Sequence, residues 1–192
     1  MSASIIAAIV VIDILQVYYF VSEIVLAVRT KQKTGNSADR GTQRLIWILI
    51  VVCGFISWAP VILDFGRILV LGDWLTWVGV ALMITGITFR QYVISFLGRF
   101  FTGQVQIQSD HELIREGPYR YVRHPSYLGM LILELGMGIA LANWFSLLLC
   151  LVLPPIGIIQ RIKVEEGELK QHFGQRYLDY RKSTWALIPY IY

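Results

Sequence analysis

The sequence contains little charge. Only 16% of its 192 residues are Asp, Glu, Lys or Arg, whereas 56% are hydrophobic; soluble domains average about 25% charged and about 45–50% apolar residues. This scarcity argues against an ordinary water-soluble domain and against a disordered chain. Cysteine is also scarce, because only Cys53 and Cys150 are present, each within an apolar run. They offer no disulfide framework and no metal-ligand spacing, so we expect two small buried side chains and no metal.

The sequence instead contains long runs of residues without a charged side chain. A helix needs about 20 residues to cross the hydrocarbon of a bilayer. The stretch 125–160 carries only Glu134 and is too long for one crossing, so we expect it to turn near Asn143. The first run lacks a basic leading region and a cleavage site, and we expect it to be retained. The sequence therefore predicts an all-α, polytopic integral membrane protein with a single domain over 1–192 and five transmembrane helices at 3–28, 45–65, 74–97, 125–141 and 144–164.

The basic residues are distributed asymmetrically. In a five-span topology, 16 of the 17 Lys and Arg residues fall on one side, and Arg67 is the exception. Since basic loops stay in the cytoplasm, that side is expected to be cytoplasmic and the N-terminus to lie outside. This asymmetry explains the net charge of +4 without a nucleic-acid partner. The membrane would be the cell membrane of a prokaryote or the endoplasmic reticulum of a eukaryote.

The predicted cytoplasmic loop 98–124 is too long and too apolar to be a simple connection. Loops of this length in compact domains are usually functional or disordered, and the aromatic and aliphatic residues here argue against disorder. Together with the tail 165–192, predicted to form an amphipathic C-terminal helix, the loop is expected to cap the helix ends. Pro125 suits the first turn of a helix, which places His124 at its mouth. A plain interfacial cluster of Tyr, Arg and His is the alternative.

Two further features concern charges at or inside the membrane. Arg161 and Glu165 are four residues apart and share a helix face, which suits either a functional site or a simple helix end at the membrane surface. Glu134 lies inside a predicted span, where acids usually face protein and have a partner. Small residues at Gly136 and Ala140 predict close helix packing.

Four motifs in the second half of the chain resemble the isoprenylcysteine carboxyl methyltransferase family, in the form of a short prokaryotic, archaeal-like member. The resemblance runs from about Gln104 to Arg181. The same segments are also similar to phospholipid N-methyltransferases and to some sterol reductases. The resemblance is therefore fairly specific for the wider superfamily of membrane methyltransferases, but less specific for one substrate. The motifs are His111-Glu112-Leu113, Gly117-Pro118-Tyr119, Arg123-His124-Pro125-Ser126-Tyr127-Leu128-Gly129, and Arg161 followed by Glu165-Glu166.

This resemblance implies S-adenosyl-L-methionine as methyl donor, with S-adenosyl-L-homocysteine as product. The acceptor it implies is the carboxylate of a C-terminal prenylcysteine or a similar prenylated, lipid-like molecule presented from the bilayer. Arg161 would position that carboxylate. A phospholipid or lipid amine N-methyltransferase is the alternative enzyme, and a non-enzymatic membrane protein is the alternative class. By the same likeness the cofactor would be bound by Gln104, His111, Glu112, Leu113, Ile114, Tyr119, His124, Pro125, Ser126, Tyr127 and Glu165.

The residue types agree with this chemistry. A carboxylate acceptor is already ionised at neutral pH and needs no general base, so the protein has to supply alignment and exclusion of water. A guanidinium can hold a carboxylate through two parallel hydrogen bonds. An amine acceptor has to be deprotonated and gains nothing from a neighbouring cation. Arg161 therefore favours the carboxylate acceptor.

Overall fold

The computed structural model describes residues 3–30, 41–68, 73–98, 101 and 113–191. Within these ranges the regular structure is helical and contains no strand longer than an isolated bridge. Three predicted site residues, Gln104, His111 and Glu112, lie outside the described residues. The helices are α1 (Ala3–Thr30), α2 (Thr42–Ile56), α3 (Ala59–Ile62), α4 (Trp74–Leu97), α5 (Pro125–Ala140), α6 (Trp144–Phe173) and α7 (Gln175–Lys182), with a 3₁₀ turn, η2, at Gly117–Arg120.

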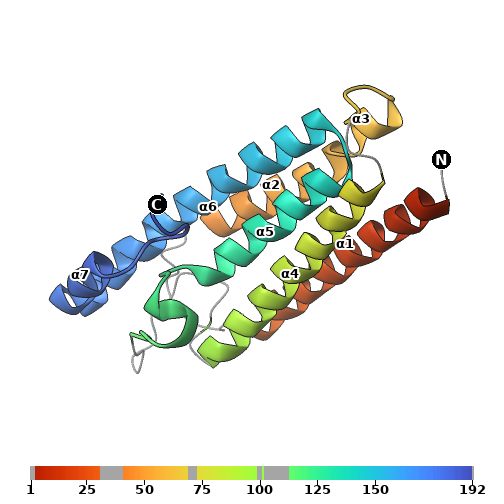
Figure 1. Ribbon diagram of the computed structural model, residues 1–192. Coiled ribbons are helices and arrows are strands. Elements are labelled where there is room, and N and C mark those ends of the chain that lie inside the picture. The colour runs from red at the N-terminus through yellow and green to blue at the C-terminus, as the bar shows by residue number, and fades with distance from the viewer. Residues whose placement is uncertain (1–2, 31–40, 69–72, 99–100, 102–112, 192) are drawn as a thin grey trace.

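The long helices form one elongated bundle (Figure 1), in which α5 packs against both α4 and α6, α1 packs against α4, and α2 packs against α6. The predicted all-helical membrane architecture is confirmed. Four segments, α1, α2 with α3, α4 and α6, are long and apolar enough to cross a membrane. The fifth, α5, has only 16 residues, or about 24 Å at 1.5 Å per residue.

Although α5 is short, it runs from one end of the bundle to the other. His124 immediately precedes it at one end, and Asn143 follows it at the opposite end, beside Arg67. The Asn143 side chain accepts hydrogen bonds from the backbone N–H groups of Phe145 (2.9 Å) and Ser146 (3.3 Å), and so caps the N-terminus of α6. Capping explains why the apolar hairpin turns here, as its sequence predicts.

Glycines allow α4 and α5 to approach at backbone distance. A Cβ on Gly79 would lie 2.3 Å from the backbone nitrogen of Ala140, and one on Gly136 would lie 2.6 Å from that of Met83. Side chains at these positions would force the two helices apart. The predicted close packing is therefore present, and its partner is α4.

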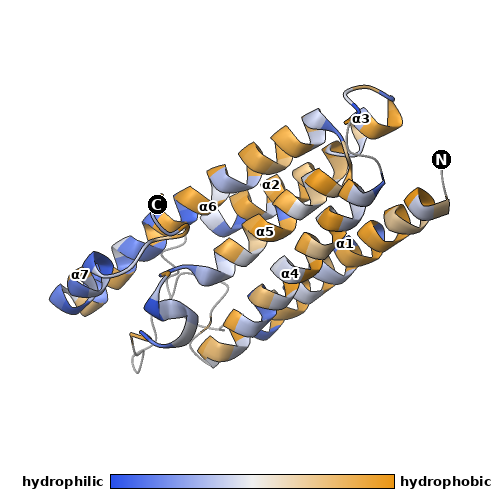
Figure 2. Cartoon of the chain, viewed as in Figure 1, coloured by the Kyte–Doolittle hydropathy of each residue, from blue (hydrophilic) through white to orange (hydrophobic). Residues whose placement is uncertain are grey.

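The charged end of the bundle is formed mainly by the C-terminal part of the chain. Helix α6 continues to Phe173, beyond the predicted span, and Gly174 (φ 54°) separates it from α7. Tyr177 and Tyr180 of α7 are buried. Figure 2 shows hydrophilic residues gathered on α7, on the end of α6 and on the segment before α5, while the rest of the bundle is predominantly hydrophobic.

Candidate functional site

Four side chains predicted to belong to the site converge where α5 begins. His124 lies at the N-cap of α5 and Tyr127 in its first turn, while Arg161 and Glu165 lie one turn apart on α6. The Glu165 carboxylate joins them. Its Oε2 lies 3.2 Å from His124 Nδ1, and its Oε1 accepts hydrogen bonds from the Tyr127 hydroxyl (2.5 Å) and from Arg161 Nε (2.9 Å). We call His124, Tyr127, Arg161 and Glu165 the Glu165 cluster.

Arg161 is almost completely buried, with 2% of its surface exposed. Besides Glu165, it contacts the Tyr127 hydroxyl (3.3 Å from Nε) and Thr42 Oγ1 (3.4 Å from Nη1). Thr42 begins α2, so the cluster joins three helices. A guanidinium this deeply buried needs charged or polar partners, since an unpaired charge in an apolar bundle is costly. Glu165, by contrast, keeps 21% of its side chain exposed, so its carboxylate can be approached from outside.

A second carboxylate supports the first from the next position in α6. Glu166 Oε1 accepts a hydrogen bond from Arg123 Nε (2.8 Å), and its Oε2 lies 3.4 Å from Arg181 Nε. Arg123 also donates to the backbone carbonyl groups of Thr184 and Arg181. Arg123 thereby ties the segment before α5 to α6 and to the residues that follow α7.

The C-terminal segment also holds His124 through its backbone. The N–H groups of Arg123 and His124 donate to the carbonyl groups of Trp185 (2.8 Å) and Ala186 (3.0 Å), and the Trp185 N–H donates to the Tyr121 carbonyl (3.1 Å). These bonds form a short parallel pairing of two extended segments. They fix the direction from which the imidazole enters the cluster.

The His124 imidazole faces two carboxylates and is 6% exposed. Burial alone would lower the pKa of His124, but the neighbouring Glu165 and Glu166 outweigh it, and the pKa lies above its ordinary value. The cationic form is therefore favoured. Nε2 lies 3.6 Å from Glu166 Oε1, too far for a hydrogen bond, and within the described part of the chain it has no hydrogen-bond partner. This N–H is itself buried and its nearest acceptor is Glu166, so a ligand would reach it only by displacing that contact.

Beneath this site, a buried ion pair connects α1 to α4. Arg90 Nε and Nη2 donate to the two oxygens of Glu23 at 2.6 and 2.8 Å, and Nη1 donates to the Ser126 carbonyl (3.1 Å). Two parallel hydrogen bonds satisfy both charges inside an apolar bundle. The third bond connects this pair to the first turn of α5, directly beside His124.

The other predicted site residues that the structure describes are placed as follows. Pro125 is the first residue of α5 and is fully buried, and Ser126 contributes its carbonyl to Arg90. The Tyr119 ring stacks on Phe96 with centroids 6.4 Å apart, and its carbonyl accepts from the Tyr180 hydroxyl (2.6 Å), so Tyr119 lies beside the Glu165 cluster and not in it. Leu113 and Ile114 are half-buried ahead of η2 and can supply only apolar contacts.

Several residues that shape this site cannot be recognised from the sequence pattern. Arg123 and Glu166 both lie inside the motifs, but nothing in their local spacing shows that they pair. Glu23 and Arg90 are charges of opposite sign in two apolar stretches, and that complementarity was the available signal. Thr42, an ordinary polar residue at a helix start, gave no signal.

Fold and site together define an α-helical integral membrane protein with a buried, charged site at one end of its bundle. Residues 78–171, about half of the chain, match the model of the isoprenylcysteine carboxyl methyltransferase family. Protein-S-isoprenylcysteine O-methyltransferase B of Arabidopsis thaliana is 34% identical over 120 residues, covering 62% of this chain and 61% of that protein. Protein-S-isoprenylcysteine O-methyltransferase of Dictyostelium discoideum is 38% identical over 131 residues, covering 62% and 51%.

A solved structure shows the same likeness. The eukaryotic intramembrane Ras methyltransferase, an isoprenylcysteine carboxyl methyltransferase, superposes with a TM-score of 0.67 and 31% identity, over 74% of this chain and 52% of that chain. The chain is thus similar to isoprenylcysteine carboxyl methyltransferases, in the part of the chain that includes the Glu165 cluster. It spans about half to three fifths of the length of the relatives it matches.

Proposed function

We propose that this protein transfers a methyl group from S-adenosyl-L-methionine to the carboxylate of a prenylcysteine or a similar prenylated, lipid-like acceptor. The relatives named above are protein-S-isoprenylcysteine O-methyltransferases. The observation that carries the proposal is the Glu165 cluster, because it brings anionic and cationic groups together at the charged end of the bundle. Both signs are needed to bind the charged ends of the cofactor and an ionised acceptor.

The residues present fit the aminoacyl end of S-adenosyl-L-methionine, which carries an ammonium and a carboxylate. Glu165 is partly exposed and can bind an ammonium, while the buried Nε2–H of cationic His124 could bind a carboxylate that displaces its contact with Glu166. When bound, S-adenosyl-L-methionine would supply an electrophilic sulfonium methyl group, which an acceptor carboxylate can take by in-line attack with S-adenosyl-L-homocysteine as the leaving group. Tyr127 and Arg161 hold the Glu165 carboxylate in place, and the surrounding helices exclude water from the site.

Arg161 is the residue proposed to orient the acceptor carboxylate. A guanidinium has five N–H donors and can bind more than one acceptor, so its contact with Glu165 is compatible with a second anion. Because Arg161 and Glu165 touch, the groups assigned to acceptor and cofactor would lie side by side. A lipid amine N-methyltransferase gains nothing from a buried cation beside its acceptor, which favours the carboxylate acceptor.

Calorimetric titration of the detergent-purified protein with S-adenosyl-L-homocysteine, followed by a methylation assay on S-farnesylcysteine, tests this proposal. We expect saturable binding and methyl ester formation. His124→Ala and Glu165→Ala should each weaken binding by about 1.5–3 kcal/mol, as expected when a hydrogen bond to a charged group is lost. Glu168→Gln, on the same helix beyond the cluster, is the matched control. Binding unchanged in both cluster variants would contradict this assignment, and methylation of a lipid amine in place of S-farnesylcysteine would support the alternative enzyme.

A further inference from the structure

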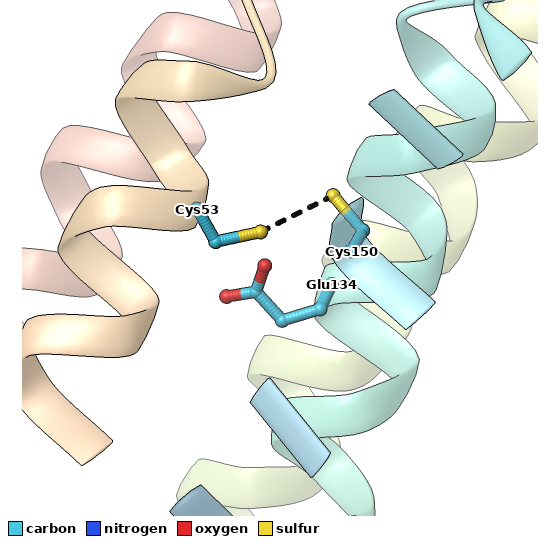
Figure 3. Close-up of side chains that lie close together, drawn as sticks. All are labelled: Cys53, Glu134 and Cys150. Atoms are coloured by element: carbon cyan, nitrogen blue, oxygen red, sulfur yellow. Dashed lines mark hydrogen bonds between the residues drawn. The ribbon is translucent and has the colours of Figure 1, made fainter. Parts of the chain in front are cut away.

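A second group of polar side chains lies inside the bundle, far from the Glu165 cluster. Cys53 on α2, Glu134 on α5 and Cys150 on α6 place one ligand atom each within 4.8 Å of one another (Figure 3). Cys150 and Glu165 are fifteen positions apart on α6, which corresponds to about 22 Å along the helix axis. The group is therefore separate from the site proposed for methyl transfer.

The three side chains are almost inaccessible to solvent. Cys53, Cys150 and Glu134 have 0%, 2% and 4% of their surface exposed. Glu134 Oε2 has no hydrogen-bond partner among the described residues, although it is buried. Leaving a buried carboxyl oxygen unsatisfied costs on the order of 1–3 kcal/mol. Figure 3 shows the Glu134 carboxyl group beside the Cys53 sulfur, with one of its oxygens directed toward that sulfur, so the unsatisfied oxygen belongs to a group that lies next to a potential metal ligand.

The distance between the two sulfurs, which share a hydrogen bond, is compatible with a tetrahedral metal site. The two Sγ atoms are 3.6 Å apart. In a tetrahedral zinc site with Zn–S bonds of about 2.3 Å, ligand sulfurs lie about 3.8 Å apart. Linear two-coordinate binding with bonds of that length would separate the sulfurs by about 4.6 Å, which fits this pair less well. The spacing therefore favours a four-coordinate ion.

Ser57 completes the surroundings of the sulfur atoms. Its hydroxyl lies 3.5 Å from Cys150 Sγ and 3.7 Å from Cys53 Sγ, and its backbone carbonyl accepts a hydrogen bond from Ser146 Oγ (2.6 Å). A hydroxyl in this position can donate to a thiolate. Two thiolates and one carboxylate around a divalent cation leave one net negative charge, which such a donor partly stabilises.

We propose that Cys53, Glu134 and Cys150 form a structural site for one Zn²⁺ ion that joins α2, α5 and α6. Thiolate and carboxylate ligands are typical of zinc, and a fully buried site suits a structural ion. Binding of Zn²⁺ forms two Zn–S bonds and two Zn–O bonds to the Glu134 carboxylate, which completes four-coordination, and releases the protons of the two thiols and of any protonated carboxyl group. The sequence analysis found no metal spacing because the two cysteines are 97 residues apart.

Metal analysis of the full-length protein in detergent tests the site. After incubation with Zn²⁺ and desalting, we expect about one Zn²⁺ per chain, with both thiols reduced. Cys53→Ser and Cys150→Ser should each lower the retained zinc at least tenfold, and Glu134→Gln should lower it to a smaller extent. The control Glu168→Gln, an acid outside this group, should retain the wild-type amount. Absence of zinc from the wild type, or the wild-type amount of zinc in both cysteine variants, would overturn the proposal.

A spectroscopic measurement on the wild type does not depend on how well the variants fold. Co²⁺ substituted into a tetrahedral thiolate site gives intense visible bands and a sulfur-to-cobalt charge-transfer band near the ultraviolet. We expect both, with loss of both on addition of Zn²⁺. Lack of the charge-transfer band, or a Cys53–Cys150 disulfide in protein purified without oxidant, would contradict a metal site.

Discussion

Glu165 is the residue on which the geometry of the site depends most directly. Its two oxygens are shared among His124, Tyr127 and Arg161, which come from two helices and the segment before one of them. A single carboxylate therefore neutralises two cationic groups in a largely buried place. Removing it would take from both cations their closest carboxylate, which costs more than the loss of one hydrogen bond.

At Arg161, charge and shape can be separated by substitution. Arg161→Lys keeps a cation that can reach Glu165 but loses the planar fork, and Arg161→Ala loses both. We expect methylation of S-farnesylcysteine to fall by at least tenfold in both variants. Affinity for S-adenosyl-L-homocysteine should fall clearly only in the Ala variant, because Glu165 then loses a partner. Steady-state kinetics beside calorimetry measure the two effects. Full activity of Arg161→Lys would show that Arg161 acts only through its charge at the membrane surface.

His124 makes the stability of the folded protein depend on pH. Its pKa in the folded state lies above its ordinary value of about 6.5 because Glu165 and Glu166 face it. The stabilisation is therefore complete below about pH 6.5 and is lost as the pH rises through the folded-state pKa. We expect the thermal midpoint in detergent to decrease between about pH 6 and pH 9, and to decrease less in His124→Gln. His172→Gln, at an exposed histidine, is the control; equal slopes in all three proteins would refute this role.

Among the helices, the contact between α4 and α5 sets the position of the site. Gly79 and Gly136 let the two backbones meet, and Gly129 lies against Arg90, which binds both Glu23 and the first turn of α5. The start of α5 is thus located by helix packing on one side and by the C-terminal segment on the other. Both are needed, because His124 projects from the point where they meet.

Gly79→Ala should therefore destabilise the bundle. The added Cβ would meet the Ala140 backbone at 2.3 Å, which no side-chain rotation can relieve. We expect a loss of about 1–3 kcal/mol, the usual range for overpacking, seen as a lower thermal midpoint. The matched control is Gly167→Ala on α6, where nothing lies within 4 Å of the added Cβ. There alanine should leave stability unchanged or raise it by up to about 1 kcal/mol. An equal effect of both substitutions would show that close packing is not the cause.

At the scale of the whole molecule, most of the basic side chains gather at one end of the bundle. The Glu165 cluster, α7 and the start of α2 lie at one end, and Arg67 lies at the other beside Asn143. The predicted orientation would place this charged end in the cytoplasm and the N-terminus outside. An acceptor with a lipid tail could then enter from the bilayer while the cofactor enters from the cytoplasm.

Cysteine labelling in membrane vesicles tests this orientation. Ser183→Cys lies at the end of α7 and Asp73→Cys at the start of α4, and both positions are exposed. A membrane-impermeant maleimide should label Ser183→Cys only in inside-out vesicles and Asp73→Cys only in right-side-out vesicles. The wild type is the control, because Cys53 and Cys150 are buried. Labelling of both positions from the same side would contradict the topology.

Much of this architecture follows from the sequence alone, because it depends on local physics. Apolar runs of sufficient length form helices in a bilayer, since every backbone polar group has to be satisfied within the segment. The turn at Asn143, the start of α5 at Pro125 and the i, i+4 contact between Arg161 and Glu165 depend on neighbours within four residues. Each of these features is present as predicted.

The tertiary structure alone decided which residues meet across helices. Glu23 and Arg90 are 67 residues apart, and Cys53 and Cys150 are 97 residues apart. Whether such pairs touch depends on the rotation of each helix about its axis and on its depth in the bundle, and no local pattern fixes either. Both are set by the close contact of α4 with α5 and by the packing of α2 and α5 against α6. For this reason the sequence identified the Arg161–Glu165 pair, whereas the Glu23–Arg90 ion pair and the group formed by Cys53, Glu134 and Cys150 emerged only from the packed bundle.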